Sequence, residues 1–304
     1  MAAKTILILG GADDEHASYM HEYLRARAQD VELLDSRWYP EKMSLTFDPG
    51  SGRGAIRLPC GRVLEYGEIR AVYWRTYYGI EAPPAADDDQ SYIAQNDARS
   101  LFESLLIHLP ARWVNGWSAY RLHQTKPVQL ASVAALGVRV PATLLTNDEA
   151  ALSDFAQRHS QAIFKPVQGG DQTRRLTKAH LAHENLVNLH LAPITVQAEV
   201  PGTNVRVFVA GERVLACEVR TAHLDYREDR EPELLVHTLS SAMQEQCCAI
   251  AHKLSLLWTG IDFRLTPENE YVFLEANPSP MFLGFQSQTG LPLSASLAEL
   301  LIRP

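Results

Sequence analysis

The chain is poor in cysteine, which bears on both its covalent framework and its cellular compartment. Four cysteines occur among 304 residues, and Cys247 and Cys248 are adjacent. No Cys-x-x-Cys pair is present, although this spacing is typical of zinc sites and of redox-active disulfides. We therefore expect reduced thiols that serve as core or surface side chains in a cytoplasmic protein.

The chain also lacks long apolar runs and an excess of positive charge. A membrane-spanning helix needs about 20 consecutive apolar residues, and the apolar run at 5–9 is too short for a signal peptide. Twenty-eight Lys and Arg residues stand against 36 Asp and Glu residues, which gives a formal net charge of −8. We therefore expect neither a membrane partner nor a nucleic-acid partner.

Two common nucleotide-binding motifs are missing as well. Gly10-Gly11 follows an apolar run, but it lacks the third glycine of a dinucleotide-binding turn and the Lys-Ser/Thr of a P-loop. A Rossmann-type dehydrogenase is therefore weakly supported. A plain turn from a strand into a helix explains the two glycines better.

The composition that remains is that of a folded, globular protein. Hydrophobic residues make up 46% and charged residues 21% of the chain. A length of 304 residues exceeds one typical core, so two or three packed units are expected. Apolar segments at 5–9 and 31–34, with a helical pattern at 19–24 between them, predict a doubly wound α/β unit.

Further segments follow the same periodicity rules. The first half predicts a loop or hairpin at 47–63, a strand at 71–75, a solvated acidic loop at 83–89, helices at 90–109 and 126–136, and strands at 138–145 and 162–165. The second half predicts a helix at 178–190, strands at 194–200, 204–210 and 213–220, a helix at 240–257, a hairpin of 260–265 with 271–276, and a helix at 293–302. Gly137 is a suitable cap for the helix at 126–136, and Pro141 indicates an edge strand.

Three oxygen-bearing side chains near the C-terminus suit a magnesium ion. Glu275 and Asn277 point to the same face of a strand, because strand side chains alternate. Asp262 can lie beside them if the two strands pair. Two carboxylates and an amide form the oxygen-only set that Mg²⁺ accepts, with phosphate and water completing its shell. The alternative is that these three residues face water on an edge strand. The apolar run before Glu275 argues against this alternative, because it places Glu275 near the end of a buried strand.

Cations for such a site are also present. Lys165 ends an apolar strand and is followed by Gly169 and Gly170, which allow backbone amides to approach an anion. Lys126 lies at the start of a helix, where a positive charge is unfavourable without a ligand. A surface turn is the alternative for the glycines. Arg206 lies in an otherwise apolar strand and needs an anionic partner.

The ordered set of these motifs resembles the ATP-grasp superfamily. Nearest within it are the ribosomal-protein glutamate ligases and the microviridin-type (graspetide) macrocycle ligases. The motifs that carry the resemblance are Trp113-Val-Asn115, Lys126-x-x-Gln129-Leu130, Phe164-Lys165-Pro166, Gln197-x-x-Val200-Pro201-Gly202, Asn204-Val205-Arg206, Asp225-Tyr226-Arg227, Gly260-x-Asp262 and Glu275-Ala276-Asn277-Pro278, with Val72-Tyr73-Trp74-Arg75 near the N-terminus and Thr289-Gly290-Leu291-Pro292 near the C-terminus.

The resemblance implies an ATP-grasp fold of mixed α/β and α+β class. It would have an N-terminal doubly wound pre-ATP-grasp domain at 1–115, a central α+β subdomain at 116–195 and a C-terminal antiparallel-sheet subdomain with a metal site at 196–304. It is also compatible with a homodimer.

The resemblance also implies residue roles. Lys126 and Lys165 would contact ATP phosphates, and Gly169 and Gly170 would belong to a loop over them. The adenine hinge would be Gln197, Ala198, Glu199 and Val200, with Asn204 near the ribose or phosphates. Arg206 and Arg227 would be catalytic and steady the transferred phosphate. The metal ligands would be Asp262, Glu275 and Asn277, for Mg²⁺ or alternatively Mn²⁺. Ala198 and Asn204 depart from the acidic residues usual at these two positions.

The activity implied is that of an ADP-forming ligase. It would join a carboxylate to an amine or hydroxyl through an acyl phosphate, on a peptide or amino-acid substrate. The alternative is a nucleotide-binding module of this fold without ligase activity. The charged segment 221–237 is compatible with docking of a leader peptide or with a solvated loop. His180 and His183 are better explained as a solvated helix face than as a metal site, because no third ligand is placed.

Overall fold

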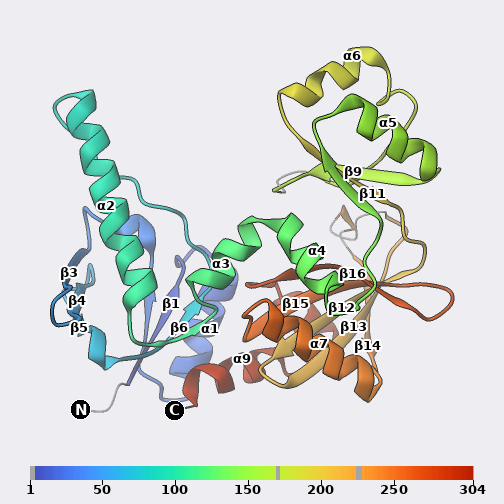
Figure 1. Ribbon diagram of the computed structural model, residues 1–304. Coiled ribbons are helices and arrows are strands. Elements are labelled where there is room, and N and C mark those ends of the chain that lie inside the picture. Colours follow the sequence, from blue (N-terminus) through green and yellow to red (C-terminus); the bar gives the residue numbers. More distant parts are fainter. Residues whose placement is uncertain (1–3, 169–171, 224–227, 230, 304) are drawn as a thin grey trace.

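The computed structural model describes residues 4–168, 172–223, 228–229 and 231–303. In this part the strands form four sheets (Figure 1). The first is parallel, as the strand–helix–strand pattern predicted. Its strands, in spatial order, are β2 (Val31–Leu34), β1 (Thr5–Leu9), β6 (Ile69–Trp74) and β7 (Arg112–Val114). Three helices pack on it, α1 (Glu15–Arg25), α2 (Asp88–His108) and α9 (Leu293–Ile302).

The two faces of this sheet bury different helices. Side chains alternate along a strand, so Ile6 and Ile8 pack with α1 and α9, whereas Leu7 and Leu9 pack with α2. The C-terminal helix therefore closes the N-terminal core, although it lies at the far end of the sequence. Asp14 caps α1, since its carboxylate accepts hydrogen bonds from the first-turn amides.

Residues 47–63 were expected to form a loop or hairpin, and they contribute to a larger structure. An antiparallel sheet of three strands lies beside α2, with Phe47 packed against the N-terminal core. Its strands are β3 (Ser44–Asp48), β4 (Arg53–Arg57) and β5 (Val63–Glu65), and the short 3₁₀ turns η1 (Ser36–Trp38) and η2 (Tyr66–Glu68) flank it.

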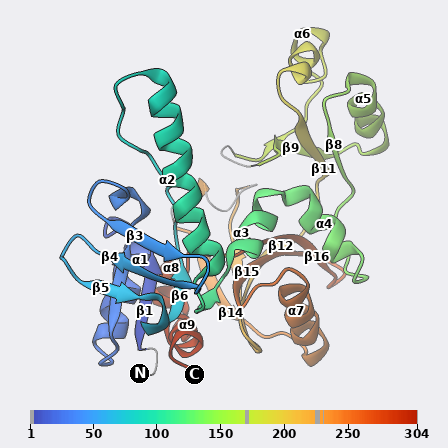
Figure 2. The same ribbon diagram turned by 60° about the vertical axis from the view of Figure 1, so that its left-hand side comes forward.

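A central sheet forms the separate lobe at the upper right of Figure 1. Its strands, in spatial order, are β10 (Arg174–Arg175), β9 (Ala162–Pro166), β11 (Ile194–Ala198) and β8 (Thr143–Thr146). Its helical elements are α5 (Glu149–Arg158), α6 (His183–Leu186) and η3 (Val187–His190). Two consecutive helices, α3 (Trp117–Gln124) and α4 (Lys126–Ala134), connect this lobe to the N-terminal sheet (Figure 2).

Two predicted segments of this lobe were wrong. The strand expected at 138–145 begins only at Thr143, after Pro141, which has no N–H for a sheet. It does lie at the sheet edge, as predicted. The helix expected at 178–190 is reduced to α6 and η3. Here the amide of Asn185 donates to the Ala179 carbonyl at 2.8 Å, an example of polar side chains competing with helical hydrogen bonds.

The C-terminal sheet is antiparallel. In spatial order its strands are β14 (Glu233–His237), β13 (Arg213–Arg220), β12 (Thr203–Ala210), β15 (Trp258–Leu265) and β16 (Tyr271–Asn277). The last four were predicted, whereas β14 was not, because its residues belong to the charged segment 221–237; they form a strand by pairing with β13. Helix α7 (Ser241–Lys253) packs on it, and α8 (Leu283–Thr289) follows β16. The helix expected at 240–257 stops four residues early, because Ser255 adopts a left-handed conformation.

Two negative expectations concern the chain as a whole. No helix in the ranges listed above combines the length and apolar character needed to cross a bilayer. All four cysteines are free, and Cys217 and Cys247 are buried. Burial raises the pKa of the Cys217 thiol to about 11 and that of Cys247 to about 12. These two are therefore inert core thiols, as expected.

Candidate active site

The β15–β16 hairpin brings the three predicted metal ligands together. Asp262 lies directly opposite Glu275 in the strand pairing. The amide nitrogen of Asn277 is 3.2 Å from Glu275 Oε1 and 3.4 Å from Asp262 Oδ2. An amide can present either its nitrogen or its oxygen to such a centre. The two carboxylates and the amide therefore converge on one point of the sheet face.

A β-bulge is responsible for this convergence. The register near the turn pairs Phe263 with Phe273, and it shifts by one residue between Asp262 and Phe263. Without this shift Asp262 would pair with Leu274, which points to the opposite face from Glu275. Bulges commonly redirect side chains near active sites. In this hairpin the bulge places both carboxylates on one face.

Each carboxylate has a cationic partner. Arg206 Nη1 lies 2.5 Å from Asp262 Oδ2, and Lys126 Nζ lies 3.0 Å from Glu275 Oε2. Burial alone would raise the pKa of Glu275. The charges of Lys126 and Lys165 and the hydrogen bonds from Lys126 and Asn277 outweigh burial and lower that pKa to about 2. Glu275 is therefore ionised at neutral pH, and the counter-charge expected from the sequence is present.

Gly260 makes room for the guanidinium of Arg206. A Cβ at position 260 would lie 2.7 Å from Arg206 Nε and Nη2. Arg206 is buried in β12 and pairs across the sheet with Asp262, one strand away. The anionic partner that the sequence required for Arg206 is thus Asp262.

Two buried amides hold the site in place, and sequence reasoning assigned them no role. Gln129 on α4 donates to the Ala276 carbonyl and accepts from the Ala276 amide, both at 2.8 Å. Asn115 donates to the carbonyls of Trp258 and Pro278, at 2.7 and 2.6 Å. Both amides belong to the motifs quoted for the family resemblance, which was the only available signal. They fix the backbone at Ala276, between Glu275 and Asn277, and at Pro278, directly after Asn277.

The predicted hinge lies in the other lobe, at the end of β11. Gln197 is buried and donates to Thr143 Oγ1 on the adjacent strand, at 2.8 Å. Arg264 donates to the Val200 carbonyl at 3.1 Å and to Asn204 Oδ1 at 2.9 Å. The side chain of Asn204, which stands where the resemblance implies an acid, is therefore hydrogen-bonded to Arg264.

One cavity of about 1080 Å³ joins these elements. It is lined by every predicted site residue that lies in the described ranges, namely Lys126, Lys165, Gln197, Ala198, Glu199, Val200, Asn204, Arg206, Asp262, Glu275 and Asn277. Gly169, Gly170 and Arg227 lie outside the described residues. The solvated edge-strand alternative for the three metal ligands is disfavoured, because they line this cavity and the side chains of Asp262 and Glu275 are only 14% and 23% exposed.

The N-terminal unit supplies a further wall of the cavity that the sequence did not predict. His16, Trp74, Arg75 and Tyr77 line it, together with Tyr120 of α3. Burial and the charge of Arg75 lower the pKa of His16 to about 4, despite an opposing effect of Asp14. The imidazole is therefore neutral at neutral pH, and its Nε2 accepts the Phe282 amide at 2.9 Å.

The predicted histidine pair does not form a shared face. His180 lies in a turn, where its Nδ1 accepts the Thr177 amide at 3.1 Å, and His183 begins α6. In the described part of the chain, no three His, Cys, Asp or Glu side chains form a metal-binding group. The set of Asp262, Glu275 and Asn277 is not such a group, because one of its members is an amide. It suits a hard cation that keeps phosphate and water ligands.

Comparison with known proteins agrees with this arrangement. Residues 124–301 match the RimK-like ATP-grasp domain. The ATP-grasp ligase PsnB complexed with minimal precursor, Mg and ADP is 28% identical, with a TM-score of 0.81 over 97% of each chain. No curated protein matches the sequence significantly.

Two further structures share the fold at lower identity. The macrocyclase MdnC from Microcystis aeruginosa MRC, bound with precursor peptide MdnA, is 22% identical, with a TM-score of 0.84 over 99% of each chain. A RiPP-associated ATP-grasp ligase from Chryseobacterium gregarium, in complex with ADP and a leader and core peptide, is 23% identical, with a TM-score of 0.84 over 98% of this chain and 96% of that one. The family match spans more than half of the sequence, and the chain therefore belongs to the RimK-like ATP-grasp family.

Proposed function

We propose that this protein is an ATP-dependent ligase that joins a carboxylate of a peptide to an amine or hydroxyl. It is an ADP-forming enzyme of the ATP-grasp type that uses ATP and Mg²⁺. The observation that carries the proposal is the single cavity in which Asp262, Glu275 and Asn277 meet the cations Lys126 and Lys165. PsnB, which is similar over nearly the whole chain, is described with a precursor, Mg and ADP.

Different residues of the cavity would bind the metal ion, the adenine and the phosphates. Asp262, Glu275 and Asn277 would hold Mg²⁺, which would neutralise charge on the phosphates. The backbone of Gln197 to Val200 would receive the adenine edge. Lys126 and Lys165 would bind phosphate oxygens, and Lys126 would then exchange part of its contact with Glu275 for the nucleotide.

The chemistry needs activation of a poor electrophile. A carboxylate oxygen attacks the γ-phosphorus and ADP departs, which converts the carboxylate into an acyl phosphate. An amine or hydroxyl then attacks the carbonyl carbon, inorganic phosphate leaves and a proton is released. Arg206 stabilises the negative charge that develops on the transferred group. Positioning and charge neutralisation therefore supply most of the catalysis, without a covalent protein nucleophile.

The same proposal extends to the domain division, the location and the partners of the protein. We propose the division 1–115, 116–195 and 196–304, a cytoplasmic location and a homodimer, without membrane or nucleic-acid partners. We also propose phosphate contacts of Gly169, Gly170 and Arg227.

Removing one metal ligand tests the ligase proposal. Glu275→Gln keeps the size of the side chain but removes the charge, so ADP formation should fall by at least about 100-fold. The assay measures ADP released in the presence of Mg²⁺ and candidate peptides that carry Asp or Glu. Mass spectrometry identifies the ligation, as the loss of one water when the nucleophile lies in the same peptide or as the added mass of a separate nucleophile less one water.

A matched control lies on the same hairpin. Glu268→Gln alters an exposed glutamate of the turn and should keep wild-type turnover. Full activity in Glu275→Gln would rule out the metal assignment. Binding of Mg-ATP without turnover on any peptide would instead favour the module without ligase activity, for which Ala198 and Asn204 are the supporting departures.

A further inference from the structure

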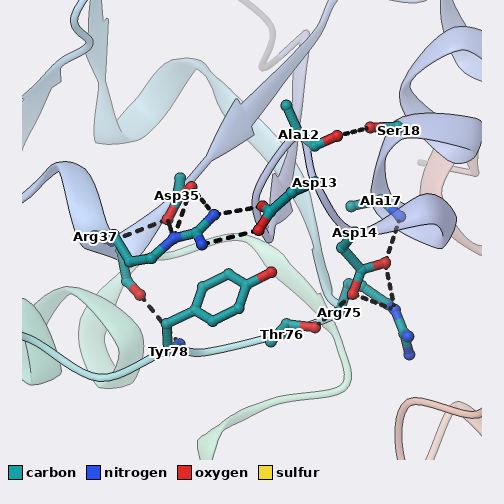
Figure 3. Close-up of polar contacts among 11 residues, drawn as sticks. Ala12, Asp13, Asp14, Ala17, Ser18, Asp35, Arg37, Arg75, Thr76 and Tyr78 are labelled. Carbon is teal, nitrogen blue, oxygen red and sulfur yellow. Dashed lines mark hydrogen bonds and ion pairs between the residues drawn. The ribbon is translucent and has the colours of Figure 1, made fainter.

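Arg75 is fixed at the boundary between the N-terminal unit and the end of the metal-binding strand. Its Nε lies 3.0 Å from both carboxylate oxygens of Asp14 (Figure 3). Its Nη1 donates to Ser279, at 2.9 Å to the carbonyl and 3.1 Å to the hydroxyl, and the Ser279 hydroxyl donates back to the Arg75 carbonyl at 2.7 Å. The side chains of Arg75 and Asp14 are 12% and 11% exposed. Such a guanidinium is held in one orientation.

The contacts of Arg75 leave part of its donor capacity for a ligand. Among the described residues, no hydrogen bond uses Nη2 of Arg75, and Arg75 lines the cavity. Asp14 shares its charge with other donors, since it also accepts from the amides of His16 and Ala17 and from the hydroxyl of Thr76. Burial would raise the pKa of Asp14, but these contacts with Arg75 at their centre lower it. Asp14 is therefore ionised and acts as a rigid support.

The position of Arg75 relative to the phosphate site suits the acceptor rather than the nucleotide. Ser279 follows Asn277 by two residues, a separation of at most about 7 Å along the chain. The hinge at 197–200 lies at the end of β11, whereas Arg75 follows β6, and these strands lie in different lobes (Figures 1 and 2). A nucleotide that runs from the hinge to Glu275 would thus end with its γ-phosphate facing Arg75.

The surroundings of Arg75 also favour a peptide ligand. Trp74, Tyr77 and Tyr120 also line the cavity, and the rings of Trp74 and Tyr120 stack with their centroids 4.7 Å apart. Aromatic walls exclude water, which strengthens a charge-assisted hydrogen bond between a guanidinium and a carboxylate. They also offer packing surface for the aliphatic and backbone atoms beside that carboxylate.

We propose that Arg75, supported by Asp14 and Ser279, binds the side-chain carboxylate of the peptide that is to be phosphorylated, and that the aromatic wall holds the adjoining peptide. The inference rests on the proposed function, since it names the group that positions the acceptor of that reaction. It assigns a specificity role to a residue of the wall that the N-terminal unit contributes to the cavity.

Direct binding of matched peptides tests this role without requiring turnover. The probes are synthetic peptides in pairs, in which one member carries a single Asp or Glu and the other carries Asn or Gln at that position. Dissociation constants are measured by fluorescence anisotropy in the presence of ADP and Mg²⁺. The wild type should prefer the carboxylate member of its best pair by about 10- to 100-fold, the range of a hydrogen bond to a charged group. Arg75→Met should reduce the ratio to about one, and Arg75→Lys should give an intermediate ratio.

Arg37 provides the matched control. It is a second arginine of the N-terminal unit with two aspartate partners, Asp13 and Asp35, and it lies outside the cavity (Figure 3). Arg37→Met should keep the wild-type ratio. Stabilisation of Arg75→Met by Mg-ATP in thermal unfolding should equal that of the wild type, which also reports a folded variant.

Several outcomes would overturn the inference. These are an unchanged carboxylate preference in Arg75→Met and Arg75→Lys, the absence of any preference in the wild type, or loss of Mg-ATP stabilisation in a folded Arg75→Met, which would assign the guanidinium to the nucleotide. A preference that depends on Arg75 in a protein that forms no ADP would support the inference while refuting the ligase proposal.

Discussion

At the scale of single residues, the site works because each charge is paired before a ligand binds. Arg206 holds Asp262, and Lys126 holds Glu275. Unpaired ions in such a buried place would cost several kcal/mol each. The same pairs place cations where phosphate oxygens are proposed to bind. A nucleotide can therefore exchange one ionic contact for another without first desolvating the protein's charges.

His16 makes stability depend on pH at this scale. Its pKa is about 4 in the folded protein and 6.5 when unperturbed, so the unfolded chain binds the proton more readily between these values. The stabilisation is fully present above pH 6.5 and is lost as the pH falls toward 4, with an upper bound of about 3 kcal/mol. His16→Gln should flatten the urea-unfolding free energy against pH in this window.

The control for this prediction is His252→Gln, at an exposed histidine in the last turn of α7. It should keep the wild-type slope. An equal slope in His16→Gln and the wild type would show that His16 does not carry the pH dependence.

At the scale of elements, helix α4 positions strand β16 through one side chain. Gln129 makes both hydrogen bonds with the backbone of Ala276, which lies between Glu275 and Asn277. The helix that begins with Lys126 thus carries both the ion-pair partner of Glu275 and the clamp on its strand. Because the two groups share one helix, their relative placement is set by helical geometry.

Gln129→Leu keeps the size of the side chain but leaves the N–H and C=O of Ala276 unpaired. Two buried unsatisfied groups should lower the free energy of unfolding by roughly 2–4 kcal/mol. Hydrogen exchange of the Ala276 amide should accelerate as well, and this readout is specific to the clamp. Gln161→Leu, at an exposed position, should change neither quantity. Unaltered exchange at Ala276 in Gln129→Leu would contradict the proposed clamp.

At the scale of the whole molecule, the cavity exists because three units meet. Asn115 is the principal connection, since it follows β7 of the N-terminal sheet and bonds to the start of β15 and the end of β16. It donates to Trp258 and Pro278 and accepts from the Leu257 amide at 2.7 Å. The C-terminal helix adds a second connection by packing on the N-terminal sheet.

Asn115→Ala should therefore destabilise the entire chain, because it leaves several buried backbone groups without partners. We expect a loss of roughly 3 kcal/mol or more in urea unfolding, along with weaker binding of Mg-ATP. Asn188→Ala, at an exposed asparagine, should stay within about 0.5 kcal/mol of the wild type. Wild-type stability in Asn115→Ala would mean that the units do not depend on this side chain.

The sequence by itself determined the family, the types of the elements and the chemical character of the site. Apolar periodicity located the C-terminal strands and the β15–β16 hairpin, since a strand with one buried face must alternate. The residue types Asp262, Glu275 and Asn277 indicated an oxygen-only site. The sequence was less informative at 178–190. A continuous helix was expected there, but local side-chain hydrogen bonds compete with helix formation and most of the segment forms turns.

Only the tertiary structure decided which side chains meet. A one-residue bulge places Asp262 on the face of Glu275, and no periodicity in the sequence encodes that shift. Arg75 and Ser279 are separated by 204 residues in the chain, yet they share hydrogen bonds. Local patterns reflect the backbone preferences of neighbouring residues, whereas such long-range contacts arise when separate units pack together. The sequence therefore predicted the residue types of the Asp262, Glu275 and Asn277 cluster, and only the packing of the units placed Arg75 and its neighbours on the same cavity.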